Sequence, residues 1–218
     1  MCIRDRELEE EPLTQSFSVS ASGSQGAESD NHFYFYTEQQ SLVWALPRVA
    51  RFRGEVARIG VDIGNVIFKV DLDGQQVQVE DAFQGVQCLV RHFGTNNVFL
   101  VSRVGRFGNA MHRSINHALL AGAGLKQLHV LKENVIFTME RAGEFGKGVV
   151  AMRVGISNFI DDQVDCLETV HDNVVGPPGK LWLFREDLSS HDARVKRCKH
   201  AFRVASWANI IAYYEPRC

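Results

Sequence analysis

Acidic residues stand at the ends of two apolar, strand-like runs of this 218-residue chain. These residues are Asp62, Asp161 and Asp162. In open α/β sheets, ligands bind at the carboxyl ends of the strands, which is where these side chains would lie. Carboxylates from separate strands suit a hard cation such as Mg²⁺, which takes one or two of them together with phosphate oxygens. The sequence therefore predicts a metal-assisted phosphoryl-transfer site.

Strand-like and helical patterns alternate along the chain between residues 56 and 184. The strand-like runs are 56–62, 97–102, 127–130 with 135–138, 156–161 and 181–184, and the helical patterns are 82–93, 109–121, 147–154 and 164–171. Glycines follow the first two helical patterns, as is common where helices end. The alternation predicts a Rossmann-like three-layer α/β domain whose mostly parallel sheet carries helices on both faces.

Residues 66–79 interrupt this alternation directly after the first strand. Two extended pieces surround Asp73-Gly74, a pair that is favoured where both turn residues need a positive φ. We therefore expect a β-hairpin at this point. A plain surface hairpin is one interpretation, but its position after Asp62 favours a flap beside the site.

Four short motifs, taken in order, resemble those of the haloacid dehalogenase (HAD) superfamily of aspartate-nucleophile phosphotransferases. They are Val61-Asp62-Ile63-Gly64-Asn65-Val66-Ile67, Phe99-Leu100-Val101-Ser102-Arg103, Gly146-Lys147-Gly148-Val149-Val150-Ala151 and Asn158-Phe159-Ile160-Asp161-Asp162. Each motif alone has a simpler interpretation; the last acidic pair, for example, could merely cap the following helix. The resemblance depends on their common order and on their places at strand ends or helix starts, over about residues 56–185.

The resemblance implies a HAD-like hydrolase, most simply a Mg²⁺-dependent phosphomonoesterase. Asp62 would attack phosphorus and form an aspartyl-phosphate, which water then cleaves. Ser102 would hydrogen-bond a phosphoryl oxygen, and Lys147 would bring a positive charge to the same group. The expected metal ligands are Asp62, Gly64 through its carbonyl, Asp161 and Asp162. The expected substrate contacts are Asn65, Ser102, Arg103 and Lys147, although Arg103 and Arg106 could also be ordinary surface arginines.

Gly64 departs from the usual pattern, in which a second Asp at this position is the general acid for the leaving group. A positioned acid contributes about 10²–10⁴-fold to the rate. Asn65 cannot replace it, because an amide has no proton to give at neutral pH. We expect slow turnover or dependence on a good leaving group. The alternative is a non-catalytic HAD-like module that binds phosphate or metal, or acts as a scaffold.

The gaps between the first three motifs are filled by strands and helices of the core itself. No room remains for a cap domain, so a capless, open site is expected. Such a site suits a phosphate on a macromolecule, or a small substrate enclosed by a partner subunit.

Three parts of the chain differ in composition. Residues 1–40 are acidic and then Ser-rich, which predicts a disordered tail, and the first six residues look like translated adapter sequence. Residues 41–190 would form the HAD-like domain. Residues 191–218 would form a basic C-terminal helix packed on it or extending it, and its segment 194–203 could bind nucleic acid or could be a solvated helix face.

Charge and cysteine content set the remaining expectations. A formal net charge of −2 predicts neither nucleic-acid nor membrane binding. No apolar run approaches the roughly 20 residues that span a bilayer. The five cysteines are scattered without a C-x-x-C pair, so reduced thiols in the cytoplasm are expected. The sequence predicts neither the physiological substrate nor the oligomeric state.

Overall fold

A six-stranded parallel sheet is the centre of the fold. The computed structural model of the chain describes residues 57–103, 124–138, 146–174, 179–185 and 200–215. Within them the strand order is β5-β4-β1-β6-β7-β8, and each neighbouring pair is parallel. The strands are β1 Arg58–Val61, β4 Val98–Arg103, β5 Val135–Thr138, β6 Ile156–Asp161, β7 Leu181–Phe184 and β8 Ala201–Val204. Because β1 lies between β4 and β6, the carboxyl end of β1 is flanked by the carboxyl ends of these two strands.

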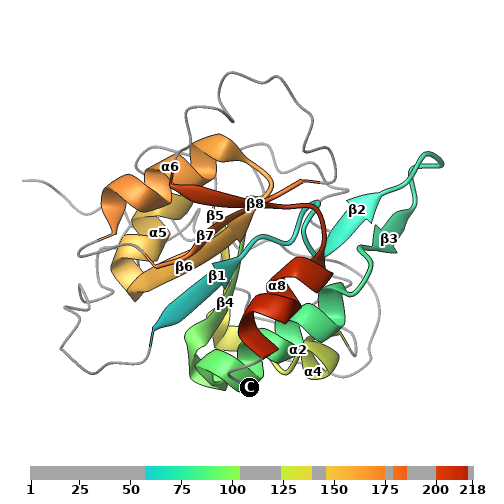
Figure 1. Cartoon of the computed structure of the whole chain (residues 1–218), viewed down its shortest axis with the longest axis horizontal. Coiled ribbons are helices and arrows are strands. Elements are labelled where there is room, and N and C mark those ends of the chain that lie inside the picture. Colours follow the sequence, from blue (N-terminus) through green and yellow to red (C-terminus); the bar gives the residue numbers. More distant parts are fainter. Residues whose placement is uncertain (1–56, 104–123, 139–145, 175–178, 186–199, 216–218) are drawn as a thin grey trace, which may run out of the picture. The chain divides into compact units, whose positions relative to one another are not determined.

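Helices cover both faces of this sheet (Figure 1). One face carries α2 Ala82–Phe93, α4 Gly124–Leu128 and α8 Trp207–Tyr214, and the other carries α5 Lys147–Val154 and α6 Val164–Asn173. Two short 3-10 turns, Thr95–Asn97 and Lys132–Asn134, precede β4 and β5. Separate clusters of buried apolar side chains fill the two interfaces. The predicted three-layer α/β architecture is therefore confirmed, whereas the strand expected at 127–130 is wrong, because α4 runs to Leu128.

The expected hairpin is present, but its turn differs from the prediction. Strands β2 Phe68–Val70 and β3 Gln76–Gln78 pair antiparallel and extend away from the six-stranded sheet (Figure 1). Gly74 has a φ of 75°, whereas Asp73 is not among the residues with positive φ. The side chain of Asp71 accepts hydrogen bonds from the backbone N–H groups of Asp73 and Gln75. This longer loop needs only one left-handed residue, which is why Gly74 alone suffices.

The described part of the C-terminal segment differs from the basic helix that we expected. Residues Ala201–Val204 form β8, which pairs with β7, and the following helix α8 has no basic residue. The expected boundary at residue 190 therefore does not separate this segment from the sheet. The proposed tail at 1–40, the helical pattern at 109–121 and residues 191–199 of the basic segment lie outside the described residues.

Trp207 attaches α8 to the domain. Its side chain is fully buried, and its indole N–H donates to the carbonyl of Val66 at 2.7 Å. A Cβ on Gly85 of α2 would lie 2.0 Å from the Trp207 ring, so the absence of a side chain there allows the close packing of the two helices.

Replacing Trp207 by Ala is expected to lower the free energy of unfolding by about 3–5 kcal/mol, since a large buried ring is lost. Urea denaturation followed by circular dichroism measures this loss. The exposed neighbour on the same helix supplies the control, since Ala208→Ser should change stability by less than about 0.5 kcal/mol. Equal effects of the two substitutions would show that α8 does not pack as described.

Candidate active site

The strand register brings the acidic residues to one edge of the sheet. Val61 of β1 is paired with Ile160 of β6, and the backbone N–H of Asp62 donates to the carbonyl of Ile160 at 2.9 Å. Asp62 and Asp161 therefore lie side by side at the carboxyl ends of two adjacent parallel strands. One carboxylate oxygen from each of Asp62, Asp161 and Asp162 lies within 4.8 Å of the others.

Lys147 lies between two of these carboxylates. Its Nζ is 2.9 Å from Oδ1 of Asp62 and 2.7 Å from Oδ2 of Asp161, and the side chain is only 2% exposed. Lys147 is the first residue of α5, which packs closely against α6 because Gly148 has no side chain: a Cβ there would lie 2.4 Å from the carbonyl oxygen of Thr169. The ammonium group is therefore held in the interior by its two partners and by its own helix.

Backbone N–H groups fix the same two carboxylates. Oδ1 of Asp62 accepts from the N–H of Ile63 at 2.8 Å, and Oδ1 of Asp161 accepts from the N–H of Gln163 at 2.9 Å. Among the described residues, both contacts of the Asp62 carboxylate therefore use Oδ1. Its other oxygen, Oδ2, is left for a cation or an electrophile.

Asp162 is held differently. It is only partly buried, and its Oδ2 accepts hydrogen bonds from the side-chain amides of Asn65 at 3.0 Å and Gln163 at 2.6 Å. Its backbone carbonyl accepts from Nε of Arg185, which follows β7, at 3.2 Å. The carboxylate of Asp162 is thus oriented by two neutral amides, and among the described residues it has no ion pair with Lys147.

Burial and crowding of like charges determine the protonation of the site. Burial, reinforced by the charges of Asp62 and Asp162, raises the pKa of Asp161 to about 7 against the pull of Lys147. Burial also raises the pKa of Asp62. Although burial opposes it, the charges of Asp161 and Asp62 raise the pKa of Lys147, so this side chain remains an ammonium. Burial raises the pKa of the nearby Cys166 thiol, which therefore stays protonated.

This donor set fits a hard divalent cation. Three carboxylates meet one ammonium, so an excess of negative charge remains at the site when all are ionised. Burial, with the nearby negative charges, raises the pKa values of Asp62 and Asp161, and a cation bound beside them would stabilise their charged forms. Oxygen donors alone are the ligands that Mg²⁺ prefers.

The raised pKa of Asp161 predicts how stability depends on pH without a metal. Between about 3.8 and about 7, the folded protein keeps a proton on Asp161 that the unfolded chain has already released. The free energy of unfolding should therefore fall as pH rises through this range. Thermal denaturation in EDTA should show a falling Tm, by about 2–4 °C for each kcal/mol lost. The decline should be shallower in Asp161→Asn, and an equal decline in both proteins would contradict the assignment.

The other expected site residues lie at the same edge. Gly64 is exposed, and no heavy atom lies within 4 Å of the position that a Cβ would take. Ser102 is 4% exposed and precedes Arg103 at the end of β4, the other neighbour of β1. Within the described residues, neither Ser102 nor Arg103 is hydrogen-bonded to the acidic group, and Arg106 lies outside them. The structure thus brings together Asp62, Lys147, Asp161, Asp162 and Asn65, and places Ser102 on the adjacent strand.

Gln163 and Arg185 were missed by the sequence reasoning. Arg185 directly follows a predicted strand, so it could have been selected as Asp62 was, as a charged residue at the carboxyl end of a strand. Gln163 follows the acidic pair, but nothing in its sequence position indicates that its side chain turns back to Asp162.

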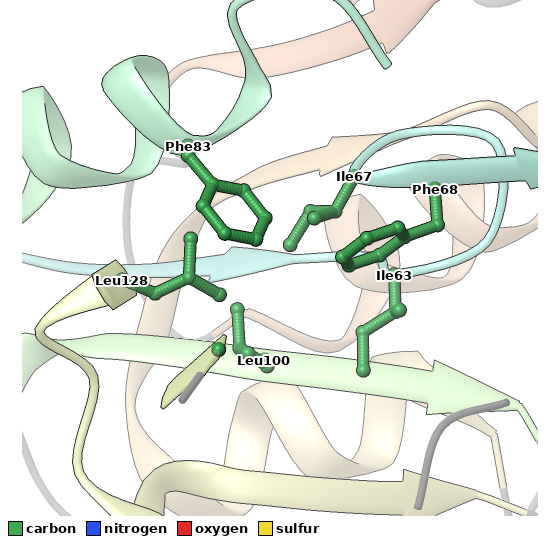
Figure 2. A pocket seen from close by; sticks show the side chains of 7 residues that line it. Ile63, Ile67, Phe68, Phe83, Leu100 and Leu128 are labelled. Atoms are coloured by element: carbon green, nitrogen blue, oxygen red, sulfur yellow. The ribbon is translucent and has the colours of Figure 1, made fainter. Parts of the chain in front are cut away.

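A small apolar pocket lies near the base of the hairpin, as Figure 2 shows. The residues that line it are Ile63, Ile67, Phe68, Phe83, Gly124, Leu100 and Leu128. Ile63 belongs to the core cluster on the α2 face, whereas Lys147 reaches Asp62 from the α5 side. None of the described side chains that line this pocket is charged, so they offer no group that would hold a phosphoryl group.

No protein-family model matches the chain, and no curated protein matches it at a significant level. Among the described residues, no helix has both the length and the apolar character needed to cross a membrane.

Proposed function

We propose that this protein is a Mg²⁺-dependent phosphatase that hydrolyses phosphomonoesters through an aspartyl-phosphate on Asp62. The observation that supports this most directly is the buried Lys147, which is in contact with both Asp62 and Asp161 beside a third carboxylate. A lysine among carboxylates at the carboxyl end of a parallel sheet is what the HAD-like motifs predict. Burying these charges is costly, so the arrangement needs a functional explanation.

Each residue has a defined task in this proposal. Oδ2 of Asp62 attacks phosphorus and displaces the ester oxygen of the substrate, while the other Asp62 oxygen is held by Lys147 and by the Ile63 N–H. The cation, held by Asp62, Asp161, Asp162 and the Gly64 carbonyl, would neutralise charge on the phosphoryl oxygens, which is the main requirement of this chemistry. Ser102 and Arg103 bind the remaining phosphoryl oxygens. Water then cleaves the bond between phosphorus and the Asp62 oxygen, which restores the free carboxylate.

The leaving group sets the expected substrate range. Gly64 supplies no proton, so the oxygen that departs must leave as a stable anion or take its proton from water or from the substrate. The site is capless in this proposal, with the hairpin as a flap, and would accept a phosphate on a macromolecule or a small phosphorylated molecule. The expected compartment is the cytoplasm.

A non-catalytic phosphate- or metal-binding module is the second candidate, and Gly64 is the observation that favours it. A screen for phosphate release from aryl and alkyl phosphates, with Mg²⁺ and with EDTA, separates the two. Release that requires Mg²⁺ supports the phosphatase. Mg²⁺-dependent binding of phosphate esters without release supports the module.

A further inference from the structure

Asn65 connects the hairpin to the acidic site. Its backbone N–H donates to the carbonyl of Phe68, the first residue of β2, at 2.6 Å. Its side-chain amide donates to Oδ2 of Asp162, 97 residues further along the chain, at 3.0 Å. Its backbone is left-handed, with a φ of 57°, a conformation that Asn tolerates better than most residues. One residue thus contacts both the flap and a carboxylate of the site.

Asp162 depends on such contacts more than the other two carboxylates do. Asp62 and Asp161 are each held by Lys147 and a backbone N–H group. The Asp162 carboxylate, by contrast, is held only through Oδ2, by two side-chain amides, among the described residues. An amide orients a carboxylate without neutralising it, so the charge of Asp162 remains available to a cation.

We propose that Asn65 is a positioning residue, which orients Asp162 toward the divalent cation and couples this carboxylate to the hairpin. This inference rests on the proposed function, because it requires a metal centre that includes Asp162. It gives Asn65 a role different from the substrate contact that we expected from the sequence, which stays a prediction. Partners that orient a metal-binding side chain typically contribute 10–100-fold to metal affinity.

Calorimetric titration of the full chain with Mg²⁺ alone tests the proposal. Asn65→Gly removes the amide but keeps a residue that adopts a positive φ without strain. His129→Gly is the matched control, because His129 has the same φ of 57° and is exposed on another loop. We expect the Mg²⁺ affinity to fall about tenfold in Asn65→Gly and to stay unchanged in His129→Gly. On an Asp162→Asn background, Asn65→Gly should cause no further loss.

Other outcomes separate this inference from the function on which it rests. An unchanged Mg²⁺ affinity in Asn65→Gly, with weaker binding in Asp162→Asn, would overturn the positioning role and leave the metal centre intact. A raised KM for the substrate in Asn65→Gly at saturating Mg²⁺, without a change in Mg²⁺ affinity, would also overturn the positioning role. It would indicate that Asn65 contacts the substrate. If Asn65→Gly lowers the Mg²⁺ affinity equally on the Asp162→Asn background, Asn65 does not act through Asp162. If Asp162→Asn itself binds Mg²⁺ like the wild type, the proposed metal centre fails, and the inference fails with it.

Discussion

Replacing Asp62 by Asn is expected to reduce Mg²⁺-dependent phosphate release by about 10⁴-fold or more, to the background of the assay. The amide is nearly isosteric and can still accept the hydrogen bond from Ile63, so the fold should persist. It cannot attack phosphorus, because it lacks the anionic oxygen that forms the aspartyl-phosphate. Among the described residues, it also leaves Lys147 with a single charged partner, Asp161.

The control for Asp62→Asn is Asp172→Asn, since Asp172 is an exposed carboxylate on α6. Phosphate release from an activated aryl phosphate is measured for both variants, and near-ultraviolet circular dichroism checks that each is folded. Wild-type activity in Asp172→Asn and none in Asp62→Asn would support the nucleophile. Equal activity in the two folded variants would end the phosphatase proposal.

Placing an acid at the open position beside Asp62 is expected to increase activity. Gly64→Asp should raise kcat for alkyl phosphates by about 10²–10⁴-fold, the range that a positioned general acid contributes. The structure has room for it: Gly64 is exposed, its φ is not in the left-handed region, and a Cβ would meet no heavy atom within 4 Å. The gain should shrink for aryl phosphates with acidic leaving groups, which need no proton to depart.

Gly64→Asn separates proton donation from the mere presence of a side chain, because Asn has the same size and no acidic proton. A series of aryl and alkyl phosphates gives the dependence of kcat on the pKa of the leaving group. This dependence should be steep for the wild type and for Gly64→Asn, and shallower for Gly64→Asp. Equal slopes in all three proteins would contradict the idea that the missing acid limits turnover.

The sheet and its acidic edge could be predicted because the patterns that indicate them lie within short stretches of sequence. Strand-like runs of four to six residues that end on an acidic residue, or are followed by one, indicate strands whose carboxyl ends meet at one edge. Glycines that follow the helical patterns, such as Gly94 after α2, indicated where these helices end. From these features alone, Asp62 and Asp161 could be expected near each other, and the register of β1 and β6 brings them to the same level.

Features that depend on distant contacts could not be predicted. Strand β8 contains Arg203 and follows a basic stretch, so nothing local marks it as the last strand of the sheet. The hairpin turn differs because the Asp71 side chain binds the loop backbone, which a two-residue turn rule does not consider. The link from Asn65 to Asp162 joins residues 97 positions apart and requires the strand register to be known first.

The contact of Lys147 with two carboxylates is the feature on which the functional account depends. In an ordinary domain, a lysine at the start of a helix would extend into solvent, where its charge costs nothing. Here it is buried, and its two partners come from separate strands. The proposed nucleophile, an adjacent positive charge and the proposed cation ligands therefore lie in one place.

Acid quenching of the enzyme during turnover of a ³²P-labelled phosphate ester tests the central claim most directly. The account predicts that Mg²⁺-dependent label stays on the protein, is released by mild base as expected of an acyl phosphate, and maps to the peptide that contains Asp62. It also predicts no label in Asp62→Asn. Turnover without any labelled protein in the wild type, or the same label in Asp62→Asn, would contradict the account.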